Sequence, residues 1–538
     1  MSWVRGRALL GSILVLSVAG CAAKPQAPDL EVIYSRVTEA SDGDPRRPLI
    51  TVPGTLGSRL VDGDTGTLVW GGGSRGLSAD PDDPVEAALI ALPILGPDTS
   101  FEDHRDSVRP AGVLDTAEAD VLGLKVKLEV YSGVRNTLSL GGFQLASGGP
   151  DRDLPADPEE LPAAVAYEQL SEEAENAFRF DYDWRRDLAS LAQDFHQFLM
   201  QRRQFVADRR SIATGDVVLP EDIRFDLLAH SMGGLITRYY LMHGPAPLGE
   251  DGALPPVTWE GAEFFDRVII VATPNAGSII AMDNLINGKE LGPFQPVYSP
   301  TLLGTHPSTW QLMPRARHRR VRFGEGGAVM DDPYDPDLWE RFGWGMAGPT
   351  SEPMLSWLMP DEPDPAERRR KALAHQARML TRAERFHAAM DRPWGRKPDH
   401  LDMFLVVGGG FQTSAEAVVD PGSGAFTITG VEEGDGVVLR ASVLLDERQG
   451  GAYTAGLNTP LRFDTVLFLP DEHVELTKNP VFGDNLLFWL LEQPRDRRDL
   501  ALPDGSLLAT ATQAVRLPDL GGVTTGGGEA DFEAGIER

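Results

Sequence analysis

The chain has 538 residues, of which 42% are hydrophobic, and its 50 basic and 80 acidic side chains give a formal net charge of −30. This length suits one large enzyme domain with insertions, or two domains, and the hydrophobic content allows a sizeable core. The negative charge argues against nucleic acid as a partner and against charge attraction to anionic lipid surfaces, because both require a positive surface.

The N-terminus has the pattern of an export signal. A basic start, the apolar run 8–18 and two small residues precede Cys21. Because Cys21 is the only cysteine, no intrachain disulfide can form. This pattern predicts a signal peptide over residues 1–20. The segment around Cys21 looks like a bacterial lipobox, in which the cysteine is lipidated; an ordinary signal peptide with an incidental cysteine is the alternative. Ala22 is similar to the residue found in outer-membrane lipoproteins, so we expect an exported protein anchored in the membrane through Cys21.

The first half of the chain contains few strong elements. Residues 21–46 are interpreted as a tether, and a strand over 48–52 runs into the glycine-rich turn 53–57. Residues 60–165, rich in Asp, Pro and Gly, are interpreted as an irregular insertion. A helix is predicted over 195–202.

The second half alternates between strands and helices. Apolar runs predict four further strands: 223–229, 267–272, 403–407 and 465–469. Helical spacing predicts three further helices: 235–242, 365–390 and 481–491. The 365–390 helix lies in a long insertion over 275–400, and residues 495–538 are interpreted as a disordered tail. Continuous apolar strands separated by helices favour an α/β fold over 47–494, with a mostly parallel sheet covered by helices on both faces.

The turn Ala229-His230-Ser231-Met232-Gly233 favours Ser231 as a nucleophile. A serine on a tight strand-to-helix turn holds its hydroxyl above the sheet, and small residues must flank it. The pattern here is Ala-x-Ser-x-Gly, which is weak by itself, but a strand precedes it and a helix follows. A serine that only caps a helix is the alternative.

A serine nucleophile needs a base, and the base needs an acid to orient it. In α/β-hydrolases the chain order is serine, acid, histidine, and only His400 and His473 lie in the stretch where a base is expected. His473 follows the strand 465–469, whereas His400 precedes a strand and is expected at the wrong end of the sheet. We therefore predict His473 as the base.

The acid is predicted to be Asp435, which lies between two glycines in a tight turn. A plain hairpin turn is the alternative interpretation, and three other aspartates are fallback candidates: Asp446, Asp464 and Asp471. Two backbone amides should bind the oxyanion. One is that of Met232, and the other is that of Thr55, with Leu56 as second choice. This chemistry requires no metal and no other cofactor.

Four stretches, taken together and in order, resemble the lecithin:cholesterol acyltransferase family, with its phospholipase A and phospholipid:diacylglycerol acyltransferase relatives. They are Val52–Leu60, Phe180–Arg185, Ala229–Gly234, and Gly434–Val437 together with His473. The resemblance implies an α/β-hydrolase fold with a large inserted cap, a membrane-facing site and an acyl-enzyme intermediate. Ala229 stands where the family has glycine, and the family's lid disulfides cannot form here. Trp184 and Arg185 are interpreted as scaffold residues.

The expected function is therefore hydrolysis of a lipid acyl ester, of the lipase or phospholipase A kind, through an acyl-Ser231 intermediate. An O-acyltransferase that moves a fatty acyl group from phospholipid to an alcohol is the alternative. A second alternative is an inactive, lipid-anchored protein of the cell envelope. The expected partner is a lipid ester at a membrane surface.

Overall fold

The computed structural model describes residues 27–39, 46–73, 76–121, 124–129, 131–145, 176–250, 252–290, 297–448 and 454–493. The predicted signal peptide, Cys21 and the predicted tail at 495–538 lie outside these residues. The described residues up to Leu491 form one compact unit.

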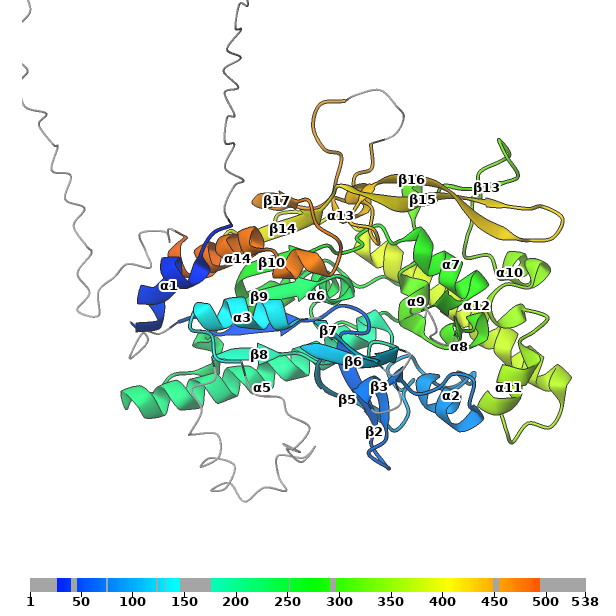
Figure 1. Cartoon of the computed structure of the whole chain (residues 1–538), viewed down its shortest axis with the longest axis horizontal. Helices are drawn as coiled ribbons and strands as arrows, with labels where there is room; N and C mark the ends of the chain where they lie inside the picture. The colour runs from blue at the N-terminus through cyan, green and yellow to red at the C-terminus, as the bar shows by residue number, and fades with distance from the viewer. Residues whose placement is uncertain are drawn as a thin grey trace, which may run out of the picture. The chain divides into compact units, whose positions relative to one another are not determined.

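A six-stranded sheet with the order β17-β14-β10-β9-β1-β8 organises this unit (Figure 1). Every neighbouring pair in it is parallel. The strands are β1 (Leu49–Val52), β8 (Ala177–Arg179), β9 (Phe225–His230), β10 (Phe265–Val271), β14 (Asp402–Gly408) and β17 (Thr465–Leu469). Val52 pairs with Ala229, and His230 pairs with Val271, so the carboxyl ends of β1, β9 and β10 meet at one edge.

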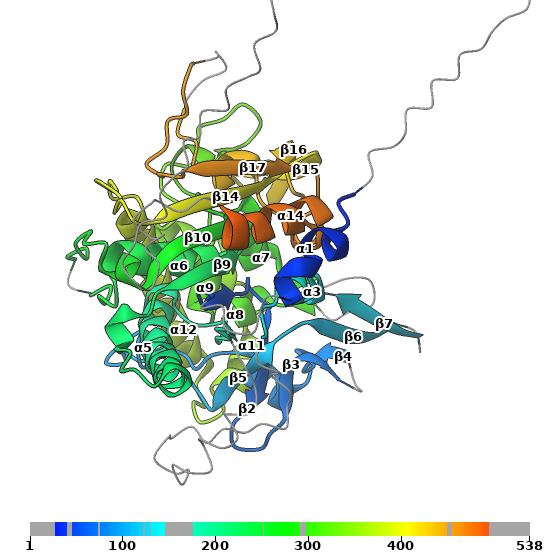
Figure 2. The same cartoon turned by 90° about the vertical axis from the view of Figure 1, so that its left-hand side faces the viewer.

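Helices cover both faces of the sheet. Successive residues of a strand point to opposite faces, so neighbouring residues belong to two different apolar clusters. Leu228 and Val271 pack in one apolar cluster with α3 (Ser132–Leu140) and α14 (Pro480–Leu487). Leu227 and Ile270 pack in another with α5 (Leu188–Thr214) and α6 (Met232–His243). Figure 2 shows α3 and α14 on one side of the strands and α5 and α6 on the other. The predicted α/β-hydrolase fold is confirmed.

The 275–400 region is mainly helical. Its helices are α7 (Ile279–Asn287), α8 (Pro300–Leu303), α9 (Pro307–Gln311), α10 (Pro336–Phe342), α11 (Glu352–Leu358) and α12 (Pro365–Met390). The short strands β11 (Lys289–Glu290) and β12 (Val297–Tyr298) pair with each other, and β13 (Val321–Phe323) joins β15 (Phe411–Val419) and β16 (Phe426–Gly434) in a small sheet. The short helix α13 (Arg440–Val443) follows β16. Asp187, which caps α5, accepts hydrogen bonds from Arg382 of α12 within the core, so this region is anchored by a buried ion pair.

The described part of 60–165 is not irregular, and that prediction was wrong. It contains β3 (Leu68–Gly73), β4 (Gly76–Ser78) and β5 (Val108–Val113), which form a four-stranded antiparallel sheet with β2 (Ser58–Asp62). The pair β6 (Thr116–Val121) and β7 (Leu124–Glu129) follows, and α2 (Pro84–Ile90) and α3 lie in the same region. The strands of the four-stranded sheet escaped prediction because they are short and their pairing is interrupted by register shifts, which hide the two-residue alternation. The strands β6 and β7 pair without such a shift and were also missed.

The expected tether over 21–46 also contains structure. Residues Leu30–Glu39 form α1, and the buried Tyr34 donates from its hydroxyl to the Asp484 carbonyl of α14 at 3.0 Å. The described helix α1 therefore packs against α14. None of the helices in the described ranges is both long and apolar enough to pass through a bilayer.

Candidate active site

Ser231 lies on the turn between β9 and α6 in a backbone conformation that few residues other than glycine adopt. Its φ is +52°, with ψ −125°. The Ser231 amide donates to the Val271 carbonyl at 2.8 Å, and its carbonyl accepts from the Thr273 hydroxyl at 2.8 Å. Strain of this kind persists only where neighbouring bonds hold it, and it is typical of a serine whose hydroxyl must stand above a sheet.

Two glycines after Ser231 let α6 pack closely against the sheet. A Cβ at Gly233 would lie 2.8 Å from the Val52 carbonyl oxygen, and one at Gly234 would collide with Thr273. Neither position could therefore carry a side chain without displacing its neighbours. Ala229, where the resembled family has glycine, is fully buried in β9.

The structure brings Ser231, His473 and Asp435 together from three distant parts of the chain. His473 Nε2 lies 2.9 Å from Ser231 Oγ, and its Nδ1 lies 2.8 Å from Asp435 Oδ2. Ser231 follows β9, Asp435 follows β16, and His473 follows β17. All three side chains are buried. We call this hydrogen-bonded arrangement the Ser–His–Asp line; it has the geometry required of a nucleophile, a base and an orienting acid.

The Asp435 carboxylate is held by its own turn. Its Oδ1 accepts from the Val437 and Val438 amides at 3.0 and 2.7 Å, while the His473 amide donates to the Asp435 carbonyl at 3.0 Å. Burial raises the pKa of Asp435, but the hydrogen bond and charge of His473 and these two amides outweigh it, so the pKa lies below its usual value. The ionised carboxylate accepts a hydrogen bond from the Nδ1–H of His473, which leaves the Nε2 lone pair facing Ser231.

The other candidates lie elsewhere. His400 precedes β14, and its Nε2 lies 3.2 Å from the Ala262 carbonyl, at the end of the sheet opposite Ser231. The fallback aspartates have other partners: Asp446 pairs with Arg448, Asp464 with Lys397 and Asp471 with Asn479.

The turn 53–57 packs directly on the nucleophile. A Cβ at Gly54 would lie 2.8 Å from Ser231 Cβ, so only glycine allows this approach. The Leu56 carbonyl accepts from Trp70 Nε1 at 2.8 Å, and Leu56 has a φ of +62°. Met232 is the first residue of α6, so its amide has no acceptor within that helix. Two segments with amide donors thus meet beside Ser231, while the choice of Thr55 over Leu56 stays a prediction.

Trp184 and Arg185 lie in the interior of the protein. Arg185 is fully buried and forms ion pairs with Asp183 and Asp106, both at 2.8 Å. The Trp184 ring makes an edge contact with Trp70, with centroids 5.6 Å apart. These contacts are those of scaffold residues.

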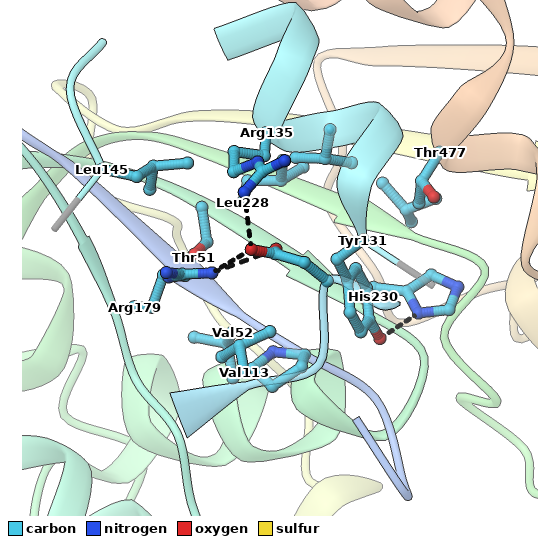
Figure 3. A pocket seen from close by; sticks show the side chains of 14 residues that line it. Thr51, Val52, Val113, Tyr131, Arg135, Leu145, Arg179, Leu228, His230 and Thr477 are labelled. Carbon is cyan, nitrogen blue, oxygen red and sulfur yellow. Dashed lines mark hydrogen bonds and ion pairs between the residues drawn. The ribbon is translucent and has the colours of Figure 1, made fainter. Parts of the chain in front are cut away.

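Sequence reasoning missed Tyr131. Its hydroxyl lies 2.9 Å from His230 Nδ1, next to the nucleophile (Figure 3). Tyr131 lies at the start of α3, in the region interpreted as irregular, and no local pattern there indicates a contact with a residue 99 positions away.

A small hollow with a cavity volume of about 30 Å³ lies on the α3 face of the sheet. Thr51, Leu228 and Val271 line it, and Arg135 and Arg179 both pair with Asp115 at its side (Figure 3). Ser231 is not among its lining residues, so we do not assign this hollow to the reacting ester. In the described ranges no group of three or more His, Cys, Asp or Glu side chains could hold a metal ion.

Comparison with known proteins gives a family match over part of the chain. Residues 169–323 match the family described as Lecithin:cholesterol acyltransferase, which confirms the resemblance over a segment that includes Ser231 but neither Asp435 nor His473. The match supports an enzyme that acts on lipid esters by hydrolysis or by acyl transfer. No curated protein matches the chain in sequence.

Two solved structures are distantly similar. One is described as "The crystal structure of Tle4-Tli4 complex"; it is 14% identical, covers 82% of this chain and 98% of its own, and has a TM-score of 0.45. The other, "Structure of EstA from Clostridium botulinum", is 11% identical, covers 61% of this chain and 82% of its own, and has a TM-score of 0.23.

Proposed function

We propose that the chain hydrolyses acyl esters of lipids through a covalent intermediate on Ser231. The observation that carries this proposal is the unbroken Ser–His–Asp line, in which His473 lies within 2.9 Å of both neighbours. The partial family match supports lipid esters as the substrate class. Glycerophospholipids and glycerides with long acyl chains are the proposed donors.

In the first half-reaction, His473 Nε2 takes the proton of Ser231 as Oγ attacks the ester carbonyl carbon. The carbonyl π bond becomes an oxyanion, which the Met232 amide and the Thr55 amide, or that of Leu56, stabilise. Each such donor contributes about 10²–10³ in rate. Asp435 stabilises the imidazolium. When the tetrahedral intermediate collapses, the bond to the leaving oxygen breaks and His473 returns the proton to it.

In the second half-reaction, His473 takes a proton from water, whose oxygen attacks the acyl-Ser231 carbonyl. The bond to Ser231 Oγ then breaks, and Oγ recovers the proton from His473 Nε2. An alcohol in place of water would give a new ester by the same steps. The family match keeps this O-acyltransferase activity as the alternative. An inactive envelope protein is disfavoured, because such a protein has no need of a complete Ser–His–Asp line.

We also propose that the protein acts as an exported lipoprotein, anchored through Cys21. The motif at residues 1–22 supports this proposal, since an anchor would hold the enzyme beside its substrate. Metabolic labelling with a fatty acid tests it: label should enter the native chain and should be lost in Cys21→Ser.

The central experiment offers the purified protein a defined phosphatidylcholine with and without a long-chain alcohol, and identifies the products by mass spectrometry. Free fatty acid in both cases supports hydrolysis, whereas a new ester formed with the alcohol supports acyl transfer. A fluorophosphonate probe should modify Ser231 in the folded protein and should not modify Ser231→Ala. Absence of an adduct on Ser231 in folded protein contradicts the proposed mechanism.

A further inference from the structure

His230 immediately precedes Ser231, and its side chain lies on the face of the sheet that α3 covers. It ends β9 and is buried, and with Tyr131 it lines the hollow on the α3 face (Figure 3). The rings of His230 and Tyr131 meet edge to face, with centroids 5.7 Å apart. The rings of His230 and His473 are 4.9 Å apart. His230 thus lies between Tyr131, which directly precedes α3, and the predicted base His473.

The direction of each hydrogen bond around Tyr131 follows from the atoms involved. The Gly54 amide donates to the Tyr131 oxygen at 2.7 Å, because an amide N–H can only donate. The single proton of the phenol is then directed to His230 Nδ1, 2.9 Å away. Because Nδ1 accepts, the proton of the neutral imidazole is on Nε2, which donates to the His473 carbonyl oxygen at 3.1 Å.

His230 stays neutral in this arrangement. Burial, followed by the proximity of His473, lowers the pKa of His230 to about 3, so the imidazole keeps one acceptor and one donor nitrogen at neutral pH. Burial also raises the pKa of Tyr131, so its hydroxyl keeps its proton. Each polar atom along the chain of bonds therefore has a partner of the right kind, and the Tyr131 oxygen has two, since it accepts from Gly54 and donates to His230.

Both ends of this chain of bonds lie next to Ser231. One end is the Gly54 amide, which begins the turn packed on Ser231 Cβ. The other end is the backbone of His473, whose amide also donates to the Asp435 carbonyl at 3.0 Å. The bonds consequently join the expected oxyanion turn, 54–57, to the loop that carries the base, by a route that avoids the reacting atoms.

We propose that Tyr131 and His230 are positioning residues that hold the oxyanion turn and the base loop at fixed positions beside Ser231. They touch no reacting atom; they act through Gly54 and His473. This proposal rests on the proposed function of Ser231. Removing the Tyr131 hydroxyl leaves the Gly54 amide and His230 Nδ1 without partners, and both loops become free to shift. A shift of either loop weakens transition-state contacts more than ground-state binding.

The chain offers a matched control pair. The buried Tyr334 hydroxyl lies 2.5 Å from His387 Nδ1, and His387 Nε2 lies 2.7 Å from the Gln311 carbonyl. The order tyrosine, histidine, carbonyl is the same, although Tyr131 additionally accepts from the Gly54 amide. Within the described residues, none of these three is hydrogen-bonded to the Ser–His–Asp line. Tyr334→Phe therefore measures the general cost of losing a buried Tyr–His bond.

The test compares Tyr131→Phe with Tyr334→Phe in steady-state ester hydrolysis, fluorophosphonate labelling rate and thermal unfolding of the full chain. For Tyr131→Phe we expect kcat and the labelling rate to fall by about 10- to 100-fold, the size of loss that a small displacement of catalytic groups causes, with KM changed less than about 2-fold. Tyr334→Phe should lower Tm by a similar amount and leave kcat within about 2-fold.

Variants of His230 provide the second measurement. His230→Gln offers one acceptor and one donor and should retain more kcat than His230→Leu, which offers neither. The double variant Tyr131→Phe/His230→Leu should be no slower than His230→Leu alone, because both changes interrupt the same chain of bonds.

Two results would overturn the inference in distinguishable ways. If the wild type hydrolyses esters and Tyr131→Phe matches it, or if the two Tyr→Phe variants lose kcat equally, the positioning role is wrong and the proposed function stands. If the folded wild type neither hydrolyses esters nor labels at Ser231, the proposed function fails and the positioning role fails with it.

Discussion

The replacement Asp435→Asn tests the Ser–His–Asp line with little change in shape. In the native site, Oδ1 accepts from the Val437 and Val438 amides, and only Oδ2 faces His473 Nδ1. In the variant, the two amides fix the oxygen of the new carboxamide in the Oδ1 position, because only an oxygen can accept them. The NH₂ group then faces His473, so Nδ1 must accept and the imidazole proton moves to Nε2.

An imidazole that carries its proton on Nε2 donates to Ser231 and cannot deprotonate it. We expect kcat to fall by about 10⁴-fold, as in other serine enzymes in which the wrong tautomer is imposed. This loss corresponds to about 5.4 kcal/mol of activation free energy, at 1.36 kcal/mol for each factor of ten. KM should change little, because the carboxylate is shielded from the substrate by His473.

The assay is steady-state hydrolysis of a p-nitrophenyl ester and of a phospholipid, with thermal unfolding as the control for folding. Asp464→Asn is the matched variant: Asp464 is a half-exposed fallback candidate that pairs with Lys397, and its replacement should leave kcat within about 2-fold. A folded Asp435→Asn protein that retains more than a tenth of native kcat, or an equal loss in Asp464→Asn, would refute the reasoning.

Three further predictions concern the base, the anchoring of the helical region and acid stability. His473→Ala should abolish ester hydrolysis while His400→Ala retains it; equal loss in kinetic assays contradicts the assignment of the base. Arg382→Met leaves Asp187 buried and unpaired and should cost about 3–5 kcal/mol in urea unfolding. Arg396→Met, which breaks an exposed pair with Asp399, should lower the free energy of unfolding by less than about 1 kcal/mol. If the two variants lose similar free energies of unfolding, the buried pair does not anchor α12. Burial lowers the pKa of five histidines to about 3: His230, His306, His318, His375 and His387. The unfolded chain therefore binds more protons below the ordinary histidine pKa of 6.5, and stability should fall as pH decreases from about 6.5 towards 3, by up to about 1.4 kcal/mol per pH unit for each histidine. A urea midpoint that is the same at pH 7 and pH 5, above the titration of most carboxylates, would contradict this.

The sequence by itself determined the elements whose signal is local. Apolar runs located β1, β9, β10, β14 and β17, and the charged amphipathic pattern located α12 with its observed bounds, Pro365–Met390. Each of these segments carries its apolar run or its helical spacing within its own residues, so no distant contact is needed to recognise it. The turn motif likewise indicated Ser231, the two flanking glycines indicated Asp435, and chain order indicated His473.

Only the tertiary structure decided which of these side chains meet, and what supports them. Ser231 and His473 are 242 positions apart, and Gly54 and Tyr131 are 77 apart, so no periodic pattern records that they are hydrogen-bonded. The pairing of β2 with β5 and the contact of α1 with α14 were also missed, since each joins segments that are remote in the chain. A hydrogen bond depends on positions and directions in space, and for residues this far apart the packed sheet and its helices determine both.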